Sequence, residues 1–273
     1  MKFFKIIFSF YINASIHVGF SVYAFVRITE QYFDLSYNEV LDYFIFYGTI
    51  TGYNFVKYAG VAKLHHRSLT NNLKIIQIFS FFCFIAMFYY GYQIPRKTLL
   101  FTIPFTLLTF LYAVPFLSGF DKSLRQISYL KIIVVAFVWA GFTVLIPLVD
   151  VGKEISLNII LVVMQRFLIV VVLILPFDIR DVKYDVISLQ TIPKKIGIER
   201  TKKLGLMLLV FSLVLEYLFT SLNMVKAPFM IFFFLLIILL MRVKRDQSKY
   251  YSSFWVESLP IVWWLLLLGF HNF

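Results

Sequence analysis

Long apolar stretches recur along the whole chain and constrain its fold more than any other feature of the sequence. Nine can be marked in the 273 residues, and each is close to the length that crosses a bilayer as a helix. This pattern predicts an all-α, polytopic membrane bundle of about nine transmembrane helices. The stretches run over about 6–27, 38–60, 73–93, 98–118, 129–149, 156–177, 204–224, 227–242 and 255–271.

The composition supports a membrane protein and excludes several other classes. Hydrophobic residues make up 61% of the chain and charged residues only 15%, with a mean hydropathy of +0.85. A soluble domain is nearer half apolar and a quarter charged. A soluble enzyme and a disordered chain are therefore excluded. Cys83 is the only cysteine, so no intrachain disulfide can form.

The excess of basic residues predicts an orientation in the membrane. The net charge is +12, which in a soluble protein would raise nucleic-acid binding. Here 20 of the 26 Lys and Arg residues fall on one side of the predicted spans, and basic loops face the cytoplasm. We therefore expect no nucleic-acid partner, a cytoplasmic N-terminus and a C-terminus on the opposite side. The expected location is a bacterial inner (plasma) membrane.

Three aspartates at the end of the sixth stretch are the strongest candidates for chemistry. Asp178, Asp181 and Asp185 are spaced by three and four residues, which places them on one face of a helix, with Arg180 and Lys183 on another. Carboxylates this close repel one another unless a cation lies between them, and Mg²⁺ prefers such oxygen ligands together with substrate phosphates. The cluster favours a Mg²⁺–diphosphate site, and the alternative is a solvated acidic helix end.

The residues around this cluster resemble a known motif. Asp178-Ile-Arg-Asp-Val-Lys-Tyr-Asp185 is followed by Thr191-Ile-Pro-Lys-Lys-Ile-Gly197. The two segments resemble the second aspartate-rich motif of UbiA-type membrane prenyltransferases and the Thr-x-Pro-x-x-x-Gly segment that follows it. Tyr112 and Lys131 are similar to aromatic and basic positions after helix four of that family. Nine helices around a central cavity is also the architecture of that family.

The first aspartate motif of the family is degenerate in this sequence. The family pattern is Asn-x-x-x-Asp-x-x-x-Asp at the end of helix two, and the corresponding segment here begins at Asn54. Tyr58 and Ala62 stand where the two aspartates are expected, and Arg67-Ser-Leu departs once from the Arg-Pro-Leu that follows in the family. Half of the implied metal site is therefore missing.

The resemblance implies a single membrane domain over 1–273, with pseudo-repeat halves of about 1–120 and 121–273. It implies transfer of a prenyl group from a polyprenyl diphosphate to an aromatic, quinone-precursor or lipid acceptor, with Mg²⁺ as cofactor. The implied catalytic and metal-binding residues are the three aspartates of the second motif. The implied substrate-binding residues are Asn54, Arg67, Tyr112, Lys131, Arg180, Lys183 and Lys194.

Three explanations of the missing aspartates remain open at this point. Cations near the first motif, among them Lys57, Lys63 and Arg67, help to neutralise the diphosphate with fewer metal ions. Alternatively, the protein binds an isoprenoid diphosphate or a quinone-like lipid without turnover. In the third explanation the cations are only a topology signal. A rival from another class is a lipid-binding or transporting membrane protein, although the converging mid-membrane polar groups of a transporter are not evident.

Polar residues inside the stretches give further expectations. Asn13 and His17 are four residues apart and would share one face of a continuous helix. Arg166 and Glu216 lie near the middle of consecutive stretches, where a lone charge is costly, so they are expected to pair structurally. Glu257 lies near the start of the last stretch, close to where the family often has Asp-Gly.

Overall fold

The structure, a computed structural model, describes residues 2–64, 71–114, 129–183, 191–219 and 223–271. Within these ranges every regular element is a helix, and the longer ones are rich in apolar residues. The helices are α1 (Lys2–Asn13), α2 (Ile16–Tyr32), α3 (Glu39–Leu64), α4 (Asn71–Gln93), α5 (Arg96–Ala113), α6 (Leu130–Ala140), η2 (Gly141–Leu145), α7 (Ile146–Asp150), α8 (Leu157–Asp181), α9 (Ile192–Ile196), α10 (Ile198–Phe219), α11 (Asn223–Arg242), η3 (Tyr251–Val256) and α12 (Leu259–His271).

The prediction of an all-α membrane bundle is confirmed, but the number of nine spans is not. In the described ranges five helical segments are long and apolar enough to cross a membrane, and the bent pair of α1 and α2 makes up to six. The five are Leu73–Gln93, Leu130–Asp150, Leu157–Asp181, Val225–Arg242 and Tyr251–Phe270.

The first predicted stretch, 6–27, is two helices rather than one. α1 and α2 meet at an angle of 55°, and Ser15 at the break has a left-handed φ of 61°. Asn54 of α3 holds this break, because its amide donates to the Ala14 carbonyl at 2.9 Å and accepts from the Ser15 hydroxyl at 2.7 Å. Asn13 therefore does not share a face with His17: Asn13 is exposed and His17 is buried.

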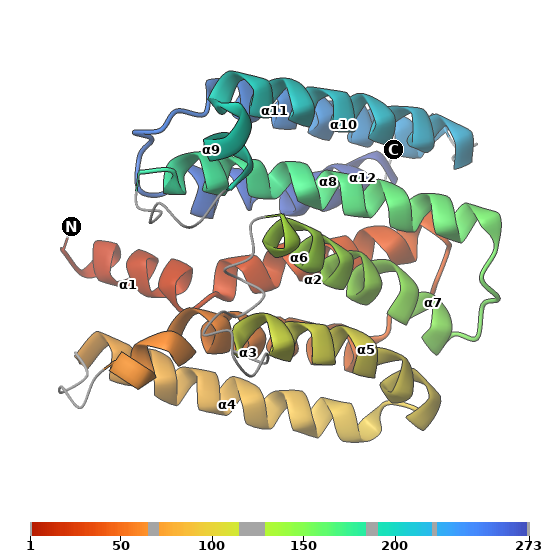
Figure 1. Ribbon diagram of the computed structural model, residues 1–273. Coiled ribbons are helices and arrows are strands. Elements are labelled where there is room, and N and C mark those ends of the chain that lie inside the picture. The colour runs from red at the N-terminus through yellow and green to blue at the C-terminus, as the bar shows by residue number, and fades with distance from the viewer. Residues whose placement is uncertain (1, 65–70, 115–128, 184–190, 220–222, 272–273) are drawn as a thin grey trace.

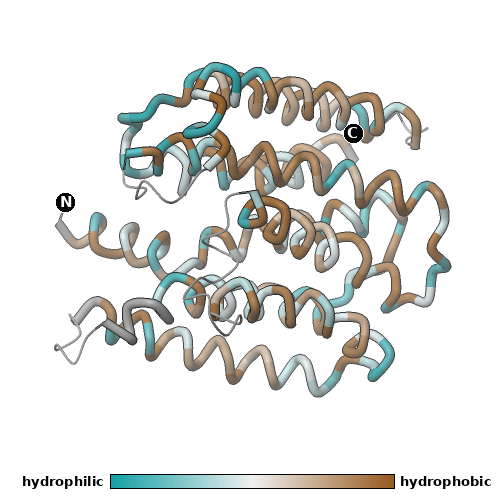
Figure 2. The backbone as a smooth tube through the Cα atoms, viewed as in Figure 1, coloured by the Kyte–Doolittle hydropathy of each residue, from teal (hydrophilic) through white to brown (hydrophobic). Residues whose placement is uncertain are grey.

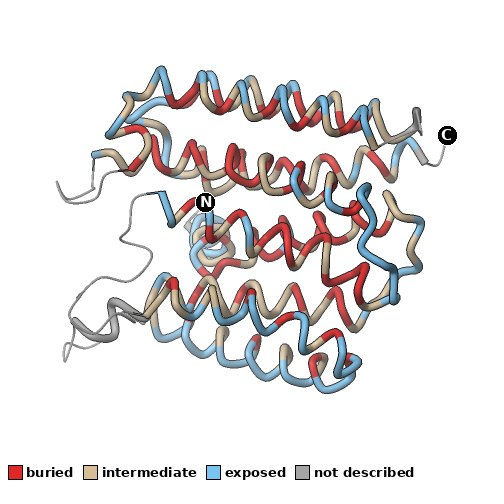
Figure 3. Tube along the Cα trace, turned by 45° about the vertical axis from the view of Figure 1, so that its right-hand side comes forward, coloured by how far each residue is buried: buried red, intermediate tan, exposed pale blue. Residues whose placement is uncertain are grey.

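The helices lie roughly side by side, with α4 at one edge of the bundle and α10 and α11 at the other (Figure 1). α3 packs along α4, α2 along α3 and α12, and α8 along α6 and α10. Hydrophobic residues cover the helices along most of their length, while hydrophilic residues gather in the connections at their ends (Figure 2). Burial is greatest in the central helices, and α4 is exposed along much of its length (Figure 3).

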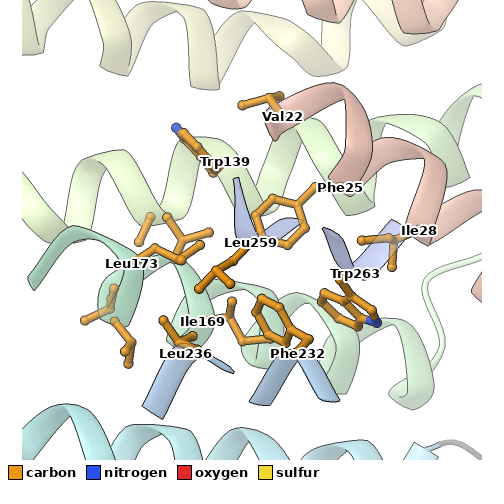
Figure 4. Close-up of a cluster of buried hydrophobic side chains, with 14 of the residues drawn as sticks. Val22, Phe25, Ile28, Trp139, Ile169, Leu173, Phe232, Leu236, Leu259 and Trp263 are labelled. Carbon is orange, nitrogen blue, oxygen red and sulfur yellow. The ribbon is translucent and has the colours of Figure 1, made fainter. Parts of the chain in front are cut away.

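The core is an aromatic and aliphatic cluster between α2, α6, α8, α11 and α12 (Figure 4). Trp263 stacks on Phe232 with ring centroids 4.6 Å apart and packs edge-on against Phe25. Ring pairs of this kind add about 0.5–1.5 kcal/mol each beyond their buried area. This cluster fixes the positions of the helices that carry the candidate site.

A buried arginine is held in this core without the predicted ion pair to Glu216. Arg166 donates to the Phe25 carbonyl at 2.8 Å, and its guanidinium lies 4.2 Å from the centroid of the Phe25 ring. Glu216 instead accepts from Gln165 and Tyr32, at 2.6 and 2.9 Å. The structural role that we expected for both residues agrees with this network, but the partners differ from the prediction.

We call the end of the bundle at which α3 and α8 end the motif end, and the opposite end the far end. Polar contacts tie the helices together at the far end. Asp150 of α7 accepts from Asn38 and Thr98, both at 2.7 Å, and Arg27 of α2 pairs with Glu30 and with the buried Asp42 of α3. These contacts join α2, α3, α5 and α7, so the far end is held together by polar side chains, and Asp42 contributes an ion pair rather than a hydrogen bond.

Candidate functional site

The candidate site is built around the last turn of α8. This helix begins at a Ser156 cap and ends at Asp181. Asp178 is fully buried, while the side chain of Asp181 is 29% exposed. Their spacing of three residues places both carboxylates on neighbouring positions of one face, as the sequence predicts.

A lysine from the next-but-one helix pairs with the buried aspartate. Lys131 lies in the first turn of α6, and its ammonium is 2.8 Å from Oδ1 of Asp178. Lys131 also interacts electrostatically with Asp181 and with Tyr112, which is buried at the end of α5. Four residues that the sequence named separately, Tyr112, Lys131, Asp178 and Asp181, are therefore neighbours from three helices.

The two cations between the aspartates behave differently from the prediction that both point away. Arg180 folds back so that its Nε donates to Oδ1 of Asp181 at 2.7 Å. Its guanidinium also lies over the ring of Phe177, 5.3 Å from the centroid. Lys183 pairs at 3.5 Å with the exposed Asp246. Arg180 is therefore part of the aspartate cluster, whereas Lys183 is bonded to a different segment.

Asn54, the residue that matches the first motif, is occupied by the fold. Besides its bonds to the α1–α2 break, its amide donates to the Ser80 hydroxyl of α4 at 2.8 Å, and the residue is only 3% exposed. Tyr58, one turn further along α3, donates to the carbonyl of Asn13 at 3.0 Å. Both residues therefore serve to join α3 to α1 and α4.

Lys57 and Glu257 belong to the charges at the motif end. Glu257 follows the π-helical turn η3, and it interacts electrostatically with Lys57 of α3 and Arg180 of α8. In the sequence Lys57 is one of several cations near the first motif, and Glu257 is a partial match to the Asp-Gly of the resembled family. Neither signal predicts that the two residues are neighbours.

The remaining predicted site residues lie on a helix other than α8 or outside the described ranges. Asp185 and Arg67 lie outside the described residues. Lys194 is half-buried on the short helix α9. α9 begins after the buried Thr191 and ends at Gly197, whose φ of 87° suits glycine. The structure thus places Asp178 and Asp181 side by side at the end of α8, and it places Asn54 in bonds to the α1–α2 break and to α4.

The donor set at α8 fits a magnesium ion that is shared with a phosphate ligand. Among the described residues no group of three acidic, histidine or cysteine side chains is placed to hold a metal ion by itself. Mg²⁺, however, is commonly bound by one or two carboxylates together with substrate phosphates and water. Asp178 and Asp181 supply two such carboxylates on one helix face.

Comparison with solved structures identifies the fold. A UbiA homolog from Archaeoglobus fulgidus bound to GPP and Mg²⁺ matches with a TM-score of 0.61 at 13% identity, over 97% of this chain and 100% of that chain. A digeranylgeranylglyceryl phosphate synthase matches with a TM-score of 0.56 at 14% identity, over 97% of both chains. The A. fulgidus homolog bound to DMAPP and Mg²⁺ matches at 0.52 and 13%, over 96% and 94%.

No family model matches the sequence, and no curated protein matches it. The chain therefore has the fold of the UbiA-type proteins, an all-helical membrane bundle, along nearly its whole length. At 13–14% identity, these matches show a shared fold.

Proposed function

We propose that the protein is an integral-membrane prenyltransferase that takes its prenyl group from an isoprenoid diphosphate. The observation that carries this proposal is the cluster at the end of α8, where Asp178 and Asp181 lie with Lys131 and Arg180. Two structural neighbours were solved with GPP or DMAPP and Mg²⁺, which supports the same ligand class here. The acceptor is an aromatic, quinone-precursor or lipid molecule.

The aspartates and cations have separate roles in this proposal. Asp178, Asp181 and Asp185 would hold Mg²⁺, which would neutralise charge on the bound diphosphate. Lys131 keeps the carboxylate of Asp178 ionised and oriented, because a buried carboxylate is stable as an anion only beside a cation. The guanidinium of Arg180 offers donors to the phosphate oxygens beyond the one that it gives to Asp181.

The chemistry requires a leaving group to be stabilised. The allylic C–O bond breaks and its electron pair leaves with the diphosphate, so negative charge grows where Lys131 and Arg180 lie. Fixed charges aimed at developing charge are usually the largest catalytic effect of an enzyme. The allylic carbon then bonds to the acceptor, which loses a proton. Tyr112, beside Lys131, is suited to line the path of the prenyl group.

The proposal includes the position of the protein in the cell. The basic loops predict that the motif end faces the cytoplasm of a bacterium, so the diphosphate enters from there and the prenyl tail lies among the apolar helices. The whole chain acts as one membrane domain. In this proposal the domain consists of two pseudo-repeat halves, about 1–120 and 121–273.

The first motif favours a second candidate, a protein of this fold that binds an isoprenoid diphosphate without turnover. Asn54 and Tyr58 bond to other helices, so the carboxylates expected at this edge of the site are replaced by neutral, structural groups. Such a protein would bind the ligand through α8 but would not ionise it.

One assay separates the two candidates. The purified protein is incubated with labelled geranyl, farnesyl or geranylgeranyl diphosphate, Mg²⁺ and a panel of acceptors, and diphosphate release is measured. We expect release that EDTA abolishes and that Asp181→Ala reduces. Binding without release would support the non-catalytic candidate, and release that is unaffected by both EDTA and Asp181→Ala would contradict the proposed enzyme.

A further inference from the structure

The charges around Glu257 form a second group, which shares Arg180 with the aspartate cluster. Lys57 of α3 and Arg180 of α8 both interact electrostatically with Glu257, and the two cations repel each other. Lys57 and Arg180 therefore bring one cation from each half of the chain to a single carboxylate. Arg180 connects this group to Asp181 of the aspartate cluster.

The three side chains of this group interact electrostatically but do not close into ion pairs. Within the described part of the chain, the Glu257 carboxylate has no side-chain hydrogen bond, and no ion pair within 4.0 Å joins it to either cation. An ion pair that served only the fold would be expected to close to hydrogen-bonding distance, because open charges lose most of their mutual attraction. The separation leaves the cations accessible to another anion.

Both cations also keep hydrogen-bond donors for a ligand. Lys57 donates to the Ser15 hydroxyl at 2.9 Å, which uses one of the three donors of its ammonium. Arg180 donates through Nε to Asp181, which leaves the four N–H groups of its two terminal nitrogens without a partner among the described residues. A phosphate group has several acceptor oxygens and is the ligand that such a pair fits.

The ammonium of Lys57 is held in place by an unusual piece of backbone. Ser15 adopts a left-handed conformation at the α1–α2 break, and its hydroxyl donates to Asn54 while it accepts from Lys57. The bonds that occupy Asn54 therefore also orient Lys57. Restricting a flexible lysine before its ligand arrives reduces the entropy lost on binding.

We propose that Lys57 and Arg180 form a subsite that binds a phosphate group of the isoprenoid diphosphate without metal, and that Glu257 competes with the ligand for these two cations. This inference rests on the proposed function for the identity of the ligand. In this proposal α3 binds the diphosphate through a lysine, Lys57, whereas the resemblance implies aspartates on this helix. The diphosphate is then held by carboxylates and metal on α8 and by a protein cation on α3.

Binding of inorganic pyrophosphate in EDTA tests the subsite without requiring turnover. Labelled pyrophosphate is titrated against the purified full-length chain, and Lys57→Met is compared with Lys57→Arg and with Lys226→Met, which removes a cation from the start of α11 at the far end. We expect Lys57→Met to weaken binding roughly tenfold or more, since a charge-assisted bond to phosphate is lost. Lys57→Arg should restore most of the affinity, and Lys226→Met should bind as the unaltered chain.

Glu257→Gln should change the affinity for pyrophosphate in the opposite direction from Lys57→Met. Removing the competing charge should tighten metal-free pyrophosphate binding at least about threefold. Binding that is undetectable in EDTA, or equal in Lys57→Met and Lys226→Met, would overturn the subsite. Unchanged pyrophosphate binding in Glu257→Gln would overturn the role of Glu257 as a competing anion.

The same measurements distinguish a failure of the subsite from a failure of the proposed function. If Lys57→Met retains both pyrophosphate affinity and prenyl transfer, the subsite is wrong and the enzyme stands. If metal-free binding depends on Lys57 but no acceptor is ever prenylated, the subsite stands and the enzymatic proposal is wrong. Size-exclusion profiles of all variants establish that each chain is folded.

Discussion

α3 and α8 end on the same side of the bundle but use their polar residues differently (Figure 1). α8 carries Asp178 and Asp181, whose partners are the cations Lys131 and Arg180. α3 carries Asn54 and Tyr58, whose partners are neutral groups of α1, the α1–α2 break and α4. Charged pairs can exchange a partner for an ionic ligand, whereas neutral bonds between helices mainly stabilise the fold.

The difference teaches that matching a motif position and performing its role are separate properties. Asn54 matches the first motif by residue type, yet its amide is used to hold the α1–α2 break. Lys57 matches no motif position, yet its ammonium has two N–H donors besides the one bonded to Ser15. It also interacts electrostatically with Glu257 and Arg180. Variants of each helix end should therefore affect different measurements.

The largest effect is expected from Asp178→Asn. This change leaves Lys131 without its buried counter-charge, and breaking a buried pair on one side costs about 3–5 kcal/mol of stability. Prenyl transfer should fall by roughly 10²–10³-fold. Thermal unfolding and diphosphate release measure the two losses.

A double variant separates the two effects of this change. Asp178→Asn combined with Lys131→Met should recover much of the stability, because no unpaired charge remains, while activity stays low. Recovery of activity in the double variant would show that the pair has no direct role in catalysis.

Asp181→Asn should affect activity more than stability. Its pair with Arg180 is partly exposed, and such pairs contribute about 0–1 kcal/mol. If Asp181 acts on the bound diphosphate, prenyl transfer should fall about 10²-fold while the unfolding temperature changes little. Asp246→Asn, which alters the exposed partner of Lys183, is the matched control and should leave both measurements unchanged.

Asn54→Leu should show the opposite pattern. It removes three hydrogen bonds, to the Ala14 carbonyl and to the Ser15 and Ser80 hydroxyls, and each such bond contributes about 0.5–1.5 kcal/mol. We expect a clear loss of thermal stability. Magnesium-dependent binding of geranyl diphosphate should change much less than it does in Asp181→Asn. A variant that is fully stable but cannot bind the diphosphate would place Asn54 in the binding site instead.

The sequence predicts more of the α8 end than of the α3 end, for a physical reason. The positions of Asp178 and Asp181 follow from helical periodicity, which is local, and a basic residue at 131 follows from a motif. The break at Ser15 depends on Asn54, a residue 39 positions away, and a pattern of apolar residues contains no information about such a contact. For the same reason the sequence does not predict Lys57 and Arg180 as neighbours of Glu257.

Tyr58→Phe should have the smallest effect and therefore gives the finest test of the comparison. The hydroxyl of Tyr58 donates to the Asn13 carbonyl at 3.0 Å in an exposed setting, and water can replace that bond. Loss of such a bond should change stability by less than about 1 kcal/mol. Because Tyr58 stands where a motif aspartate is expected, a residue that takes part in metal or diphosphate binding should instead give a large loss of prenyl transfer. Near-normal stability and diphosphate release in Tyr58→Phe, measured beside Asp181→Asn, would mean that α3 contributes to catalysis through Lys57 and not through its motif positions.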